Sequence, residues 1–66
     1  MWARVCIDVD DDQHVIGFSA EVHSGEEITD IIVWPVAPDV SAFDVLQVAL
    51  ADLHRRYGTQ LALELF

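Results

Sequence analysis

Lysine and asparagine are absent from this sequence of 66 residues, and a single cysteine is present. One cysteine, Cys6, excludes an intrachain disulfide, and the Cys and His residues lack the spacing of a zinc site. No apolar run approaches the ~20 residues that a membrane-spanning helix needs. The start carries no basic segment followed by an apolar core, as a secretion signal would. These absences predict a cytoplasmic protein with a free thiol and no contact with a membrane.

Positive charge is scarce as well: three basic residues stand against twelve acidic ones, for a net charge of −9. Direct binding to a nucleic-acid backbone needs clustered Lys and Arg, so this class of partner is excluded. An acidic chain suits a basic protein partner, or the charge serves solubility alone. The candidate acidic surface comprises Asp8, Asp10, Asp11, Asp12, Glu26 and Glu27.

Apolar residues are abundant for so short a chain, at 53% of the sequence. Residues 1–66 make a single small domain, and a domain of this size is marginally stable alone. One small core cannot absorb all of these side chains, so some of them stay outside it. We therefore expect a two-fold homodimer or another protein partner. The predicted homodimer contact uses the uncovered sheet face or the free edge of the last strand, which lacks protective Lys or Pro.

Alternating apolar and polar residues predict four strands, at 3–9, 14–23, 28–34 and 61–66. Polar turns at 10–13 and 24–27 are short enough for hairpins, so the first three strands are expected to form an antiparallel meander. Pro35 and Pro38 end the third strand.

The segment Ser41–Tyr57 predicts the one helix. Its apolar residues recur at helical spacing, and we expect them to pack on the sheet. Ser41 is the predicted N-cap, with a hydroxyl that accepts a backbone N–H, and Gly58 supplies the stop. The predicted core stripe consists of Phe43, Leu46, Leu50, Leu53 and Tyr57, widened by Ala42 and Ala49.

The element order is β-β-β-α-β. A right-handed crossover through the helix brings the fourth strand beside the first and parallel to it. The predicted fold is therefore α+β, with one helix packed on a four-stranded mixed sheet of strand order 3-2-1-4.

This order, with Asp8 in the first strand and Asp44 early in the helix, resembles the first half of the ribonuclease H fold. Truncated versions of that fold form the N-terminal domain of HicB-type antitoxins, which are acidic and neutralise a small basic toxin. The resemblance is one of topology and covers nearly the whole chain. It implies a domain that binds and neutralises a basic protein. The turn after the second strand reads His23-Ser24-Gly25-Glu26, where such antitoxins usually carry proline and glycine.

Asp8, Asp44 and Glu64 occupy positions similar to the metal-binding carboxylates of ribonuclease H. In that enzyme the carboxylates hold two metal ions that promote cleavage of a phosphodiester. Alternation argues against such a site, because Asp8 and Glu64 point away from the helix that carries Asp44. We therefore predict no catalytic residues, although a small metal-dependent nuclease remains an alternative function.

The run from Asp8 to Asp12 begins like an EF-hand calcium loop. The sixth position requires Gly and is Gln13, and the twelfth requires Glu and is Ser19, so the motif fails. The three histidines lie far apart in the sequence pattern, at His14, His23 and His54. No metal site and no cofactor are predicted.

Apolar residues outside the predicted core make up the candidate interface. Alternation places either Ile31 and Val33, or Ile28, Ile32 and Trp34, on the uncovered sheet face. The candidate interface residues are Trp2, Cys6, Val15 and Phe66 on this face, Val33 with them, and Val45 and Val48 on the outer side of the helix. The predicted function is a non-catalytic, acidic protein-binding module, either antitoxin-like or a phage-encoded inhibitor of a host protein. An acidic mimic of nucleic acid is a further alternative.

Overall fold

The structure, a computed structural model, describes residues 1–65, with only the backbone of Thr59 and Leu65. Three strands precede the helix and one follows it, which confirms the predicted order. The elements are β1 (Trp2–Val9), β2 (Val15–Ser24), β3 (Glu27–Pro35), α1 (Ala42–Tyr57), a short 3-10 helix (Gly58–Gln60) and β4 (Ala62–Leu65). No helix in this part of the chain is long and apolar enough to cross a membrane.

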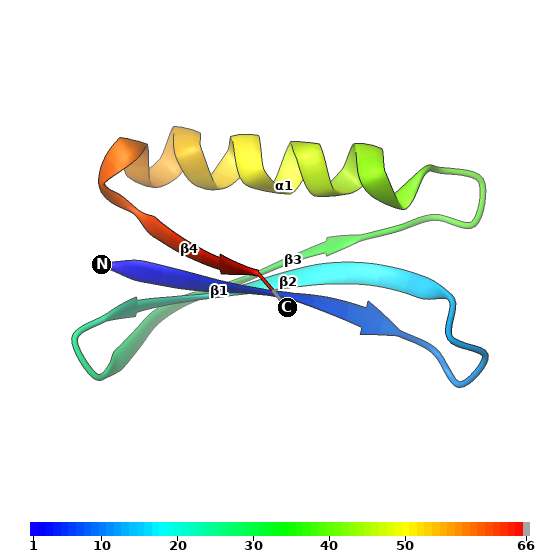
Figure 1. Ribbon diagram of the computed structural model, residues 1–66, viewed down its shortest axis with the longest axis horizontal. Coiled ribbons are helices and arrows are strands. Elements are labelled where there is room, and N and C mark those ends of the chain that lie inside the picture. The colour runs from blue at the N-terminus through cyan, green and yellow to red at the C-terminus, as the bar shows by residue number, and fades with distance from the viewer. Residues whose placement is uncertain (66) are drawn as a thin grey trace.

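The sheet has the predicted strand order, β3-β2-β1-β4. β2 pairs antiparallel with both β1 and β3, and β4 pairs parallel with β1. The helix α1 covers one face of this sheet and leaves the other face open (Figure 1). The α+β class with a single helix is therefore confirmed, and β3 and β4 form the two edges of the sheet.

The core lies between the helix and the middle of the sheet. Its fully buried members include small residues on β1 and β2, and Leu53 is the largest side chain among them. Alanines let the helix approach the sheet closely, and Ile32 and Trp34 of β3 pack against the same cluster. The buried residues are Ala3, Val5, Phe18, Ala20, Val22, Ala49 and Leu53.

The buried side of α1 matches the predicted stripe in part, because Leu46 and Tyr57 pack against the core as predicted and Phe43 does not. It is centred on Ala49 and Leu53, and Phe43 is 65% exposed, so its assignment to the core is wrong. Successive helical residues turn by about 100°, which places Phe43 about 120° from Ala49 and Val45 only about 40° from it. Val45 is accordingly half-buried, not on the outer side as predicted, whereas Val48 is exposed as predicted.

The helix ends were predicted in position but not fully in chemistry. Ser41 is the N-cap residue, but its side chain makes no capping hydrogen bond, and only its carbonyl accepts, from the Val45 N–H at 3.2 Å. At the other end Gly58 has a φ of 74°, a conformation that favours glycine, and its N–H donates to the His54 carbonyl.

Two register shifts change which face some side chains occupy. One lies between Asp8 and Val9 of β1, where Val9 pairs with Val15. Val9 lies on the same face of β1 as the buried Val5, so its partner Val15 lies on the helix side, and the predicted place of Val15 on the open face is wrong. The other shift follows Val22 of β2, whose carbonyl accepts a hydrogen bond from the Thr29 hydroxyl at 3.2 Å.

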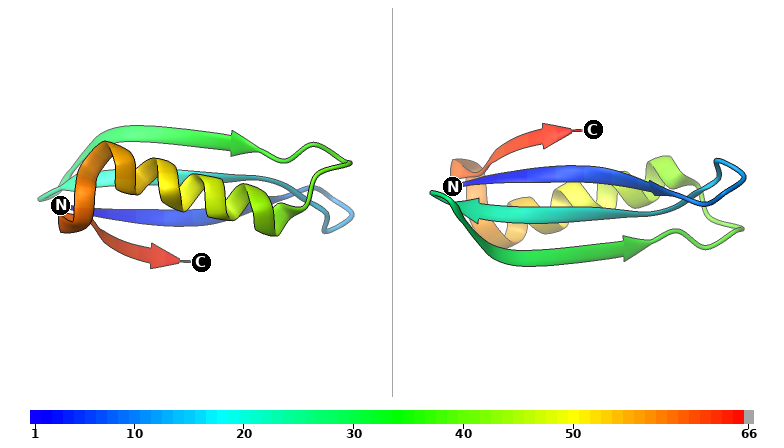
Figure 2. Two further views of the ribbon diagram at one scale, coloured as in Figure 1. Left: turned by 90° about the horizontal axis from the view of Figure 1, so that it is seen from above. Right: turned by 90° about the horizontal axis from the view of Figure 1, so that it is seen from below.

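The helix crosses the sheet diagonally, as the two views in Figure 2 show. Its C-terminal part lies near β3, and its first turn lies toward β1 and away from β3. The short β4 pairs only with Trp2–Val5 of β1. The predicted interface residue Phe66 lies outside the described residues.

Candidate functional site

One half of the open sheet face is covered by its own polar and aromatic side chains. Trp2 of β1 stacks on His23 of β2, with ring centroids 4.0 Å apart and an interplanar angle of 4°. The Arg4 guanidinium lies 5.6 Å from the centroid of the Trp2 ring, and its Nε is 4.0 Å from Glu64 Oε2. The His23 Nε2 atom is buried without a hydrogen-bond partner, 3.7 Å from Glu21 Oε1. The predicted interface residue Trp2 is thus half-buried in a contact of its own domain.

The other half of the open face, along β3, is aliphatic and exposed. Ile31 and Val33 are 62% and 61% exposed, and Ile28 is 50% exposed. Val33 pairs with Ser19, and Ile31 with Glu21, on the face away from the core. Cys6 of β1 is half-buried on the same face, and Ser19 of β2 lies between it and Val33. Among the predicted interface residues, Val33 and Cys6 therefore share the open face, two strands apart.

Sequence alternation alone left open which β3 residues face outward. The register shift answers this, because Ile28 pairs with His23 on the open face while Ile32 pairs with the buried Ala20. Ile28 thus joins Ile31 and Val33, which sequence reasoning had treated as exclusive of it. Ile28 and Ile31 are three residues apart, which in a regular strand places them on opposite faces. They share a face only because Thr29 is the extra residue of a bulge, and the sequence did not mark it as one.

A second apolar surface lies on the helix side, where α1 diverges from β3. Predicted interface residues Val45 and Val48 belong to it, and Val48 is 60% exposed. Trp34 lines this second surface, so its indole lies on the helix side of the sheet and not on the open face. The lining residues of this shallow groove are Trp34, Pro35, Val40, Asp44, Val45 and Val48.

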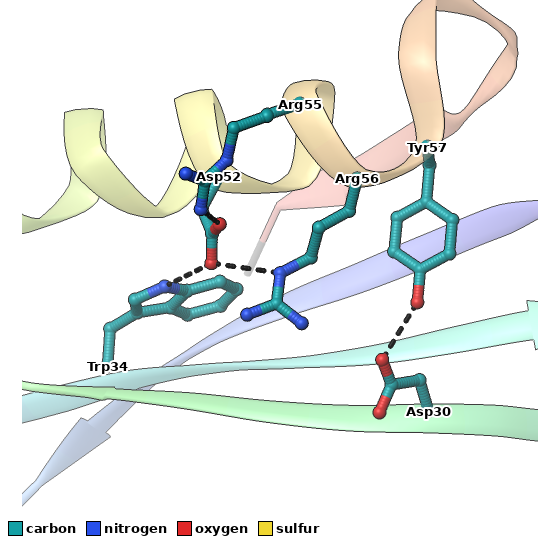
Figure 3. A network of polar contacts seen from close by, with 6 residues as sticks. All are labelled: Asp30, Trp34, Asp52, Arg55, Arg56 and Tyr57. Carbon is teal, nitrogen blue, oxygen red and sulfur yellow. Dashed lines mark hydrogen bonds and ion pairs between the residues drawn. The ribbon is translucent and has the colours of Figure 1, made fainter.

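Between this groove and the C-terminal end of α1, a polar network joins helix and sheet (Figure 3). The Trp34 indole Nε1 donates to Asp52 Oδ2 at 3.1 Å, and Arg56 Nε lies 3.2 Å from the same oxygen. Arg55 pairs with the other Asp52 oxygen. The hydrogen bond from Arg55, followed by that from Arg56, lowers the pKa of Asp52 to about 2. This network fixes the orientation of the helix above β3.

A second helix-to-sheet contact lies one turn further along α1. The Tyr57 hydroxyl donates to Asp30 Oδ2 of β3 at 2.8 Å (Figure 3). The Asp30 carboxylate, as acceptor, raises the pKa of Tyr57 above its ordinary value. Both contacts hold side chains of β3 and α1 together.

The acidic turn between β1 and β2 brings together the residues best suited to hold a cation. Asp10 Oδ1 accepts the backbone N–H groups of Asp12 and His14, each at 2.9 Å, and Gln13 has a φ of 66°. The His14 N–H is the main cause of the lowered pKa of Asp10. Side-chain ligand atoms of Asp10, Asp12 and His14 lie within 4.8 Å of one another. Sequence reasoning missed this grouping, which the Asp10-centred turn produces.

The turn borders an open cleft between the β1–β2 connection and the segment before α1. Asp10 and His14 stand beside its apolar wall, which includes Val15, Val36 and Val40. The predicted interface residue Val15 thus lies in this cleft. The remaining predicted acidic residues are spread over the surface: Asp11 and Asp12 at this turn, Glu26 and Glu27 at the opposite end of the sheet, and Asp8 on the open face.

The carboxylates compared with those of ribonuclease H do not share one side of the sheet. Asp8 pairs with Gly17 and Glu64 with Arg4, on the open face, while α1 carries Asp44 on the other side. A two-metal centre needs its ligands around ions only about 4 Å apart. The arrangement therefore does not bring these three residues into one metal site.

Comparison with known proteins found no matching protein family, no matching curated protein and no matching solved structure.

Proposed function

We propose that this domain is a non-catalytic binding module for another protein chain. The observation that carries the proposal is the aliphatic row along β3, formed by Ile28, Ile31 and Val33. These three side chains are each at least half exposed and adjacent on the open face. Scattered single apolar residues are normal on protein surfaces, but a contiguous row on a sheet edge is typical of a contact surface.

Charge defines the surroundings of this contact. Glu26 and Glu27 precede the row, and Glu21 borders it on β2. A partner with an apolar centre and a basic rim would match this surface when the partner is a different protein. With a net charge of −9, the chain repels other acidic surfaces and attracts basic ones over a Debye length of ~8 Å at physiological ionic strength.

Site-specific photo-crosslinking tests the proposal. A benzophenone amino acid replaces Val33 in the protein expressed in the organism that carries its gene, and the matched control carries it at the exposed, polar helix residue Gln47. We expect discrete protein adducts from position 33 and few from position 47. Equal adduct patterns from both positions would show that the β3 row is ordinary surface and would refute the proposal.

A further inference from the structure

The outer edge of β3 offers backbone hydrogen-bonding groups at the same residues that carry the aliphatic row. The Val36 N–H donates to the Ile16 carbonyl at 2.9 Å, which marks a hydrogen-bonded pair of β2 and β3. Such pairs alternate along an antiparallel ladder, so Trp34 and Ile32 direct their backbone groups toward β2. Ile31 and Val33 therefore direct their N–H and C=O groups outward, away from the sheet.

The protection that natural edge strands carry lies toward the two ends of β3, at the Thr29 bulge with Asp30 and at Pro35, and the segment 31–34 between them has none. The chain contains no lysine, and Pro35 interrupts the outward-facing positions only at the end of β3. We propose that a second copy of this chain occupies the edge, with the two β3 strands pairing antiparallel about a two-fold axis at Ile32. The inference rests on the proposed function and names the partner of the β3 row.

The two-fold pairing satisfies the backbone groups of both copies. With the axis at Ile32, Ile31 of one copy stands opposite Val33 of the other, as a hydrogen-bonded pair. These are the residues with outward N–H and C=O groups, and their exposed side chains meet on the open face. The result is one continuous eight-stranded sheet with both helices on the same side.

The distribution of charge along β3 favours this antiparallel arrangement. Acidic residues lie in the first part of the strand and its turn, at Glu26, Glu27 and Asp30, and the segment from Ile31 to Pro38 carries no charge. Antiparallel pairing places the acidic part of one copy opposite the uncharged part of the other. A parallel pair would place like charges directly opposite, which destabilises cross-strand contacts.

The helix side adds a complementary contact. In the same register, Asp30 of one copy lies opposite Trp34 of the other. Trp34 is bonded to Asp52, around which Arg55 and Arg56 gather (Figure 3). The opposing carboxylate, which accepts from Tyr57 of its own chain, thus faces a cluster of two arginines and one aspartate with a net charge of +1. The apolar groove with Trp34, Val45 and Val48 lies on the same side of the molecule and extends the contact from the sheet to α1.

The dimensions of the molecule suit a stable dimer. It measures 35 × 22 × 15 Å. Figure 1 looks down the shortest of these axes, which runs from strand to strand across the sheet. The side that carries β3 and α1 therefore spans the two longer dimensions. The outline of that side, 35 × 22 Å or about 770 Å², is similar in size to the ~800 Å² that specific interfaces bury on each partner.

Sedimentation equilibrium of the purified chain at high micromolar concentration, at one low and one high salt concentration, tests the inference. We expect a dimer mass, with an affinity that rises at higher salt because screening weakens the repulsion between two chains of net charge −9. Val33→Lys should abolish the dimer, whereas Leu63→Lys, at an exposed residue near the other sheet edge, should leave it intact. Circular dichroism of each variant verifies that it is folded.

Disulfide trapping tests the register even where a lysine variant fails to fold. In a Cys6→Ser background, chains with Ile31→Cys are mixed with chains with Val33→Cys and oxidised. Opposed residues of a hydrogen-bonded pair have Cα atoms about 5.5 Å apart, within the range for a disulfide. We expect the mixed disulfide to form faster than either like pair.

A monomer mass at both salt concentrations, or a dimer lost with Leu63→Lys and kept with Val33→Lys, would overturn the homodimer at β3. Trapping of like pairs only would overturn the register. If the chain is monomeric while position 33 crosslinks to a different protein, the proposed function stands and this inference alone fails.

Discussion

Leu53 and Phe43 lie in the same apolar spacing of the sequence, and the structure separates them completely. Leu53 is 0% exposed and packs in the core, whereas Phe43 is 65% exposed. Leu53→Ala removes about 2–2.5 kcal/mol of burial free energy at ~0.8 kcal/mol per carbon, and the cavity left behind raises the cost to about 3–5 kcal/mol. A domain of this size has a total stability of only about 3–5 kcal/mol. We therefore expect the Leu53→Ala chain to be largely unfolded at room temperature.

Phe43→Ala is the matched control, and it should change the free energy of unfolding by less than ~0.5 kcal/mol. Urea denaturation followed by far-ultraviolet circular dichroism measures both variants at one protein concentration, so that self-association contributes equally. Similar midpoints for the two variants would show that the helix does not present Ala49 and Leu53 to the sheet. The rotation of α1 about its own axis described above would then be incorrect.

Two further predictions concern the polar contacts between α1 and β3. The pKa of Asp52 in the folded chain, about 2, lies below its ordinary value of 3.8, so its stabilising contribution is present above that value and is lost as the pH falls toward 2. Asp52→Asn should make the free energy of unfolding fall less steeply as the pH is lowered, as measured by urea denaturation at several pH values. The same pH dependence in the parent chain and in Asp52→Asn would contradict the pairing of Asp52 with the arginines. Tyr57→Phe removes the hydrogen bond to Asp30 and should cost about 0.5–1.5 kcal/mol, or more if the half-buried carboxylate is left without a donor. A variant as stable as the parent chain in the same denaturation assay would contradict that contact.

Local patterns in the sequence were sufficient to predict the strands, the helix and the order of the sheet. Alternation is a property of each strand alone, and Pro35 and the acidic turn at Asp10 mark the ends of strands regardless of packing. The face on which side chains lie beyond a bulge could not be predicted in this way, because one inserted residue moves all following side chains to the opposite face. Val15 moved to the helix side and Ile28 to the open face for this reason.

Spacing alone predicted most of the face that the helix presents to the sheet, including Leu46 and Leu53, but not the exposure of Phe43. Large apolar residues suggested a stripe through Phe43, but the small side chains of Ala42 and Ala49 allow the closest approach to the sheet. The face of the sheet on which Trp34 lies was also left open, because the sequence allowed either set of alternating β3 residues to point toward the helix. Its place on the helix side depends on the distant Asp52, which accepts its indole N–H.

The parallel pairing of β1 with β4 has a consequence for how the chain folds. The meander of β1, β2 and β3 closes through turns of a few residues, while β4 returns to β1 across most of the sequence, with the Ala62 N–H donating to the Met1 carbonyl at 3.3 Å. Closing a long loop costs more chain entropy than closing a short one, and the four residues of β4 recover little of it until α1 has docked. We therefore expect the hairpins and the helix to assemble before β4 joins β1, and the pairing of β1 with β4 to open first on unfolding.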